Sequence, residues 1–261
     1  NTISSTVGMG NIAGVAIALC VGGPGAIFWM WVSALLGMAT KFFEGTLAVM
    51  YKGKDDKGVA QGGPMFVLTE GIGRKMKPLA VMFAFCALFS GLPVMQANQL
   101  SESLYSVILE PLGVPESRWV FLVIGLMIGG IVSLVIFGGL KRISLVSSKI
   151  VPFMVGFYFL MVLGIMIVYH DRLPAVFEAI FEGAFCWKAG FGAFATVALT
   201  GARRAMFVNE AGVGTAGMMH GASMNAEPVR EGLVAMLGPA IDSGLVCTLS
   251  AIPMIMAGLY S

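Results

Sequence analysis

The sequence predicts an all-α protein that crosses a membrane several times. Hydrophobic residues make up 57% of the 261 residues and charged residues only 11%, whereas soluble domains are about 25% charged. Long runs without a charged side chain cover residues 1–40, 79–101, 119–140, 150–169 and 243–261. Each run is near or above the roughly 20 residues that a spanning helix needs, and far longer than the roughly 10-residue strands of a membrane barrel.

Taken in order, the hydrophobic segments predict about seven helical elements. An initial segment covers residues 1–20, and a long helix follows at about 24–50. Further spans are expected near residues 79–108, 118–138, 147–169, 189–206 and 232–260. Before the sixth element, apolar residues recur at helical intervals: Leu173, Val176, Phe177, Ile180 and Phe181. This spacing predicts a short helix within residues 170–187 that lies in the outer membrane interface.

The positions of lysine and arginine predict how these spans are oriented. Alternate connections hold 12 of the 16 basic residues: Lys52, Lys54, Lys57, Arg74, Lys75, Lys77, Lys141, Arg142, Lys149, Arg203, Arg204 and Arg230. Because basic residues concentrate in cytoplasmic loops, we expect these connections to lie inside the cell. The chain is therefore expected to be a multi-pass protein of the cell membrane, with the lipid bilayer as its surroundings.

Other features of the sequence exclude several classes of partner and chemistry. The net charge of +2 and the lack of a dense basic tract argue against nucleic acid. The cysteines lie far apart without a CxxC pair, so we assign them to packing rather than to a metal. His220 has no second His or Cys nearby and is not expected to be a ligand. The motifs HExxH and GxSxG are absent, so no enzyme is expected.

The first hydrophobic element contains residues that weaken a helix. Gly8, Gly10 and Asn11 fall within an otherwise apolar stretch. A broken helix in a membrane leaves unpaired backbone groups, so it persists only where protein, water or a ligand satisfies them. The ends of such half-helices suit a substrate carboxylate and Na⁺. The alternative is a contact face of small residues, with Gly10 and Gly14 at GxxxG spacing.

A similar Gly-x-Gly-polar pattern recurs late in the chain. It ends in Gly212, Gly214 and Thr215, within the glycine-rich stretch that runs from Asn209 to Gly217. The similarity is either chance or the signature of an inverted-repeat transporter, in which corresponding helices of the two halves are broken.

Polar side chains on the spans provide further candidate sites. Gln96 and Gln99 form one helical stripe, and Asn98 and Glu102 form another. One stripe could face a central cavity, or the amides could hydrogen-bond to neighbouring helices without a functional role. On the last span, Asp242 is an intramembrane carboxylate, which indicates either a functional site or a pair with an arginine or the backbone.

Charged residues near the cytoplasmic ends of the spans also have two interpretations. Lys41 and Glu44 are three residues apart on the second span and are expected to pair with each other as a structural contact. Arg203 and Arg204 could form a gate with Glu210, or they could anchor the sixth span at the cytoplasmic surface.

Several strings along the chain resemble one family of transporters. They begin at Val7, Gly22, Gly37, Gly62, Arg204 and Pro228 and read V-G-M-G-N-I-A-G-V-A, G-G-P-G-A, G-M-A-T-K-F, G-G-P-M, R-A-M-F-V-N-E-A-G and P-V-R-E-G-L-V-A-M-L. In this order they strongly resemble the sodium:alanine (alanine/glycine:cation) symporter family, and the match runs from the first residue to the last.

This resemblance implies a fold and a site. The fold would be LeuT-type, with two inverted five-helix repeats whose first and sixth helices are broken. One transmembrane domain, truncated at both ends, would hold most of the first repeat in residues 1–184 and the start of the second in residues 185–261. The resemblance places Thr6, Gly8, Met9, Gly10, Asn11, Gln96, Phe191 and Phe194 at the substrate, and Ser4, Val7 and Asn11 at Na⁺. The sixth-helix break would be the stretch Gly190–Phe194, with Phe191 or Phe194 as a lid.

The implied function is sodium-coupled symport of a small neutral amino acid, alanine or glycine, by alternating access. Na⁺ would be the coupling ion, and no organic cofactor is implied. Another ion-coupled transporter of small solutes, or a channel-like protein, is the alternative. A channel is less consistent with the sequence because no repeated acidic or carbonyl filter string is present.

Overall fold

The computed structural model describes residues 8–54, 60–90, 94–185, 191–223, 225 and 227–258. The longer helices are α2 (Met9–Gly22), α3 (Gly25–Met50), α5 (Lys77–Ser90), α6 (Val94–Leu104), α7 (Arg118–Ile136), α8 (Gly139–Val168), α9 (Leu173–Ala184), α10 (Phe191–Asn209), α12 (Pro228–Ala235) and α14 (Cys247–Met256). Short helices are α4 (Pro64–Phe66), α11 (Thr215–Gly221) and α13 (Leu237–Pro239), the π-helices η1 (Val67–Ile72), η3 (Tyr105–Leu109) and η6 (Ala240–Val246), and the 3₁₀ turns η2 (Arg74–Met76) and η4 (His170–Arg172).

Four helices are long and apolar enough to cross a membrane. They are Gly25–Met50, Arg118–Ile136, Leu145–Val168 and Pro228–Met256, and a shorter apolar helix covers Gly10–Gly22. The last of the four combines α12, α13, η6 and α14 in one continuous helix. The structure therefore confirms an all-α membrane protein.

Individual elements agree with the sequence to different degrees. The helix expected at 24–50 is α3, that at 118–138 is α7, and the short helix within 170–187 is α9. The span expected at 147–169 is the apolar part Leu145–Val168 of α8, a helix that itself begins at Gly139. The span expected at 79–108 is described as α5 and α6, and residues 91–93 between them lie outside the described residues. An antiparallel pair of short strands, β1 (Gly53–Lys54) and β2 (Ala60–Gln61), was not expected from the sequence.

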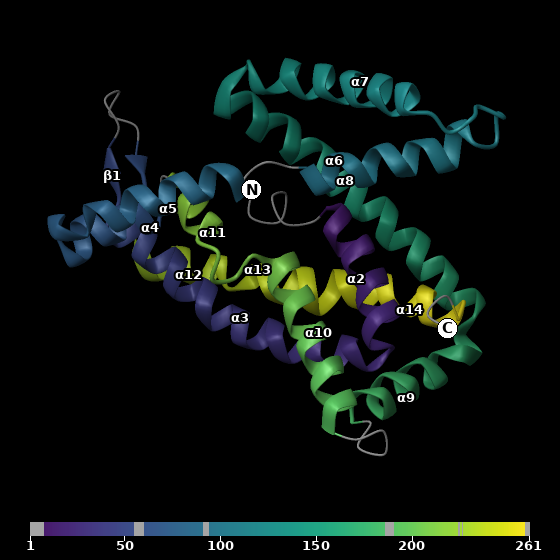
Figure 1. The fold of residues 1–261 in the computed structure, drawn as a ribbon. Coiled ribbons are helices and arrows are strands. Elements are labelled where there is room, and N and C mark those ends of the chain that lie inside the picture. Colours follow the sequence, from purple (N-terminus) through teal and green to yellow (C-terminus); the bar gives the residue numbers. More distant parts are fainter. Residues whose placement is uncertain are drawn as a thin grey trace.

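Helix α3 is the centre of the bundle, because α2, α9, α10, α11, α12 and η6 all contact it. In Figure 1, α10 crosses α3, while α12 to α14 extend along it. The core joins buried residues of these helices, including Val15, Ile27, Ile180, Val208 and Ile252. By contrast, α7 lies along the upper edge of Figure 1 away from α3 and contacts α6 and α8. Its side chains are mostly exposed and apolar, which suits a helix surrounded by lipid.

The crossing of α3 and α10 depends on a glycine. A Cβ atom added at Gly201 would lie 2.3 Å from the carbonyl oxygen of Ala26 and 2.7 Å from the Cβ of Trp29. The two helices therefore approach so closely that a methyl group fits only if they separate.

We expect Gly201→Ala to lower the free energy of unfolding by about 1–3 kcal/mol, the usual cost of forcing extra atoms into a well-filled interior. Gly192→Ala on the same helix is the matched control, because a Cβ there meets nothing within 4 Å and alanine favours a helix. Thermal unfolding of the detergent-solubilised protein compares the two. Equal melting temperatures would show that the crossing tolerates a methyl group.

Candidate functional site at the start of α2

The first described helix starts one residue after an extended glycine. Gly8 has φ −162° and ψ −163°, and α2 is helical from Met9. The Asn11 N–H donates to the Gly8 carbonyl at 3.0 Å, and the Asn11 Oδ1 accepts a long hydrogen bond of 3.5 Å from the Gly8 N–H. Gly10 and Asn11 therefore belong to the first helical turn, although the sequence suggested that they weaken the helix. The predicted Ser4, Thr6 and Val7 lie outside the described residues.

The Asn11 side chain is buried but incompletely hydrogen-bonded. It is 1% exposed, and its Nδ2 has no hydrogen-bond partner among the described residues. A buried donor without an acceptor costs about 1–3 kcal/mol. Because the first N–H groups of a helix also lack partners within the helix and attract negative charge, the start of α2 presents several donors suited to an anionic group.

Helix α2 runs antiparallel to α10. A Cβ at Gly14 would lie 3.4 Å from Val208, and one at Gly22 would lie 3.3 Å from Thr200. The start of α2 is therefore beside the end of α10. Phe194 is 14 residues before Val208, which corresponds to about 20 Å along a helix.

The structure accordingly separates Phe191 and Phe194 from the start of α2, and neither covers it as a lid. Their rings contact each other, with centroids 6.2 Å apart, and the Phe194 ring meets Trp29 at 5.4 Å. Residues 191–194 are also helical, so the break expected in the stretch Gly190–Phe194 is not found there. Gly190 itself lies outside the described residues. These aromatic residues instead form a cluster with the beginning of α3.

Gln96 lies on α6, which contacts α2. Its side chain is exposed, as is that of Asn98, whereas Gln99 is half-buried. The structure thus places Gln96 on a helix that contacts α2. Among the described residues, no hydrogen bond joins the Gln96 side chain to another helix.

The second glycine-rich stretch is a true interruption. Helix α10 ends at Asn209, and Glu210, Gly212 and Gly214 have φ values of 52°, 86° and 87° before α11 begins at Thr215. The left-handed region favours glycine, and a glutamate there is uncommon. A carboxylate of α3 holds this connection, because Glu44 Oε1 accepts a hydrogen bond from the Gly212 N–H at 2.9 Å.

A buried group of charges surrounds the same connection. Lys41 is 2% exposed and Asp242 is 1% exposed, and Lys41 interacts electrostatically with Glu210, Glu44 and Asp242. Asp242 lies in the π-helix η6, and π-helical turns are frequent at functional sites. Lys41 therefore interacts with carboxylates of α3, of the connection after α10 and of η6. The sequence suggested only the local pair with Glu44.

The predicted gate of Arg203, Arg204 and Glu210 is not formed in this structure. Glu210 accepts a hydrogen bond from the Thr215 hydroxyl at 2.5 Å, and its positive neighbour is Lys41. No ion pair joins either arginine to Glu210 in the described ranges. The residue that balances Glu210 thus comes from α3 and not from α10.

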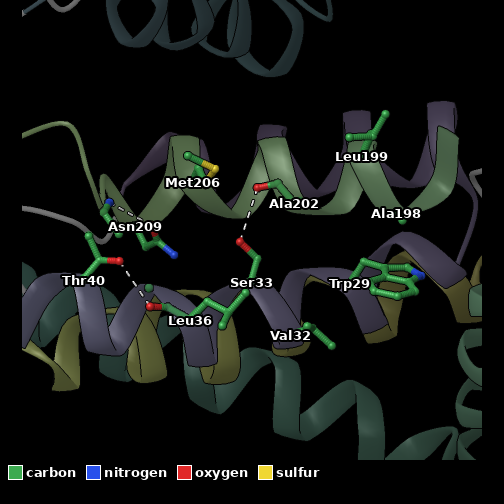
Figure 2. Close-up of a pocket in the computed structure, with 12 residues that line it drawn as sticks. Trp29, Val32, Ser33, Leu36, Thr40, Ala198, Leu199, Ala202, Met206 and Asn209 are labelled. Carbon is green, nitrogen blue, oxygen red and sulfur yellow. Dashed lines mark hydrogen bonds between the residues drawn. The ribbon is translucent and has the colours of Figure 1, made fainter. Parts of the chain in front are cut away.

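A groove of about 400 Å³ lies between α3 and α10. Figure 2 shows Trp29 at one end and Asn209 with Thr40 at the other. The Ser33 hydroxyl donates to the Ala202 carbonyl at 3.5 Å and so bridges the two helices. The lining is mostly apolar and includes neither Asn11 nor Gln96, so this groove is separate from the start of α2.

Comparison with known proteins identifies the family. The model of the sodium:alanine symporter family matches residues 1–261. The chain belongs to this family. Members of the sodium:alanine symporter family are transporters rather than enzymes, and the chain is an integral multi-pass protein of the cell membrane.

Three relatives indicate how the sodium:alanine symporter family varies. The sodium/alanine symporter AgcS of Methanococcus maripaludis is 40% identical over 98% of this chain and 56% of its own length. From Bacillus subtilis, the putative sodium/proton-dependent alanine carrier protein YrbD is 39% identical over 99% and 52%, and the probable sodium/glutamine symporter GlnT is 33% identical over 99% and 52%. The chain spans about half the length of these curated relatives.

Two further buried polar residues of this family member were not among the predicted site residues. Asn209 is fully buried, and its Nδ2 has no hydrogen-bond partner among the described residues. Ser243, also fully buried, has a hydroxyl without a partner in the same part of the chain. Only their positions in the sequence could have indicated these residues. Asn209 belongs to one of the strings that resemble the family, and Ser243 directly follows Asp242.

We expect Glu44→Ala to loosen the connection after α10. Hydrogen bonds to a charged group contribute about 1.5–3 kcal/mol, so amide hydrogen exchange of residues 210–217 should accelerate by about tenfold or more. Mass spectrometry of exchanged peptides measures this directly. Glu178→Ala, at an exposed position on α9, should leave these peptides unchanged, and equal exchange in both variants would remove Glu44 from this role.

Proposed function

We propose that this chain works in sodium-coupled symport of a small neutral amino acid, alanine or glycine, across the cell membrane. The observation that carries the proposal is the buried Asn11 amide at the start of α2, whose Nδ2 lacks a partner among the residues that the structure describes. Membership of the sodium:alanine symporter family supports Na⁺ as the coupling ion.

Each part of this site would have a distinct role. The Asn11 Nδ2 and the N–H groups of Gly8, Met9 and Gly10 would donate to the substrate carboxylate, aided by the positive end of α2. The Asn11 Oδ1, whose bond to Gly8 is long, remains available to Na⁺. Thr6 would complete the substrate site, Ser4 and Val7 would add oxygen ligands for Na⁺, and Gln96 would line the cavity from α6.

We infer that residues 1–184 form most of one repeat of a LeuT-type fold and residues 185–261 the start of a second. The antiparallel contact of α2 with α10 supports this inference, because the first helices of two inverted repeats run in opposite directions. The interruption at residues 210–214 supplies a second broken segment near the end of α10.

Alternating access would follow from the connections among these helices. The close contacts of Gly14 with Val208 and Gly22 with Thr200 couple α2 to α10, and Glu44 couples the end of α10 to α3. These helices would move as one body while Na⁺ and substrate occupy the start of α2. Each inward Na⁺ charge gains about 2.3 kcal/mol per 100 mV of membrane potential, enough to drive accumulation of a neutral solute.

The test is uptake of radiolabelled alanine into proteoliposomes that contain the native-length transporter. An inward Na⁺ gradient should drive saturable accumulation above the level reached with K⁺, and glycine should compete. Glutamine and a proton gradient are necessary comparisons, because GlnT is named for glutamine and YrbD for sodium or protons. Uptake that does not depend on Na⁺ would refute the coupling, and uptake that does not saturate would indicate a channel.

A further inference from the structure

A second pocket lies where the end of α2 meets α10. Its volume is about 320 Å³, and it is lined by Val21, Thr200, Arg203, Arg204 and Phe207. Four of these residues come from α10 at spacings of three and four, so they share one helical face. Thr200 and the two arginines therefore line one side of the pocket, and Val21 of α2 lines the other.

Neither arginine is neutralised within the described part of the chain. No salt bridge or hydrogen bond joins the side chain of Arg203 or Arg204 to another residue there. Charged side chains in membrane helices are costly unless they are paired or reach the interface. Arg203 is exposed and Arg204 half-buried, so a ligand approaching from the surface can reach them.

The rim of the pocket is apolar and exposed. Val21 is 60% exposed and Phe207 is 48% exposed. A phosphate bound to the arginines would thus have hydrocarbon surface beside it. An acidic side chain would satisfy the arginines but would leave this apolar rim uncovered, whereas an anionic phospholipid satisfies both.

We propose that Arg203 and Arg204 bind the phosphate of an anionic phospholipid, with the Thr200 hydroxyl as an additional donor and the acyl chains against Val21 and Phe207. Arginine suits this role because its planar group donates two parallel hydrogen bonds to phosphate oxygens. An anionic phospholipid carries such a phosphate directly beside its hydrocarbon chains, which matches the arrangement of arginines and apolar rim in this pocket. The site is separate from the start of α2 and does not depend on the proposed transport.

The experiment measures lipid binding to the delipidated native-length protein by native mass spectrometry. Phosphatidylglycerol should bind at least about tenfold more tightly than phosphatidylcholine of the same acyl chains, because each basic residue adds to the attraction for anionic lipid. The double variant Arg203→Gln/Arg204→Gln should lose this preference. Arg142→Gln, at an exposed position on α8, should retain it.

Other outcomes would overturn the proposal. Equal binding of the two lipids by the unaltered protein would do so without any variant, which covers the case that the double variant fails to fold. Equal loss in Arg142→Gln would indicate a general charge effect. If soluble glycerol phosphate displaced the lipid at comparable concentration, the site would be for a free phosphate ester. If the double variant were destabilised even without lipid, while the lipid preference stayed unchanged, the arginines would pair with protein.

Discussion

Lys41→Met is expected to lower the free energy of unfolding by about 3–5 kcal/mol, the usual cost of removing one partner from a buried charge pair. Lys41 is almost fully buried, and the variant would leave Glu44, Glu210 and Asp242 without its positive charge. The measurement is the thermal or denaturant unfolding of the purified protein. Lys149→Met, at an exposed position on α8, is the matched control and should change the stability little.

A second substitution separates loss of charge from loss of contact area. Asp242 is the most deeply buried of the three carboxylates, so Asp242→Asn added to Lys41→Met should recover part of the lost stability by removing a buried negative charge. If Lys41→Met lowered the free energy of unfolding no more than Lys149→Met does, Lys41 would not be stabilising the buried carboxylates.

Asn11→Ala is expected to reduce sodium-driven alanine uptake by about 10-fold to 100-fold. This range corresponds to the loss of one hydrogen bond to a charged group, about 1.5–3 kcal/mol. The folded protein should nevertheless remain about as stable as before, because the Asn11 Nδ2 has no partner within the described protein. Uptake and melting temperature, measured on the same preparation, should therefore respond differently.

The control for Asn11→Ala is a second amide on the neighbouring helix. Asn98 is two residues from Gln96 on α6 and so points about 200° around the helix from it. We expect Gln96→Ala to impair uptake and Asn98→Ala to leave it near normal. If Asn11→Ala transported normally, or lost uptake only in proportion to its stability, Asn11 would be a structural residue.

The lengths of the hydrophobic runs predicted the long apolar helices. Helix α3 and helix α7 agree with expectation because each is a long apolar segment with clear ends. The strand pair β1–β2 and the π-helix η6 could not be predicted, since both depend on how their neighbours pack rather than on periodicity. Packing between distant segments is likewise invisible in the sequence: Gly45 of α3 closely approaches Ala235 of α12, about 190 residues later.

The candidate site was predicted in part. The sequence indicated the start of α2 because Gly8, Gly10 and Asn11 weaken a helix in an apolar segment, and it indicated the interruption after Asn209 for the same reason. The structure has Phe191 and Phe194 in the aromatic cluster with Trp29 rather than beside the start of α2. Similarity in sequence does not give how far two antiparallel helices are shifted along each other, and the contacts of Gly14 with Val208 and of Gly22 with Thr200 set this shift for α2 and α10.

Charge partners were the least predictable feature. Lys41 and Asp242 are about 200 residues apart in the sequence, and spacing alone offered Glu44 as the partner of Lys41. The nearest basic residues in sequence to Glu210 are Arg203 and Arg204, yet Lys41 is its positive neighbour. Burial makes these distant interactions matter, because charges inside a membrane protein are poorly screened.

The most direct test of the central claim is equilibrium binding of radiolabelled alanine to the purified native-length transporter, with Na⁺ and with choline in its place. The account predicts that Na⁺ raises the affinity for alanine, that alanine raises the affinity for Na⁺ by the same factor, and that Asn11→Ala abolishes this coupling. Alanine binding of equal strength in Na⁺ and choline would contradict a shared sodium and substrate site at the start of α2.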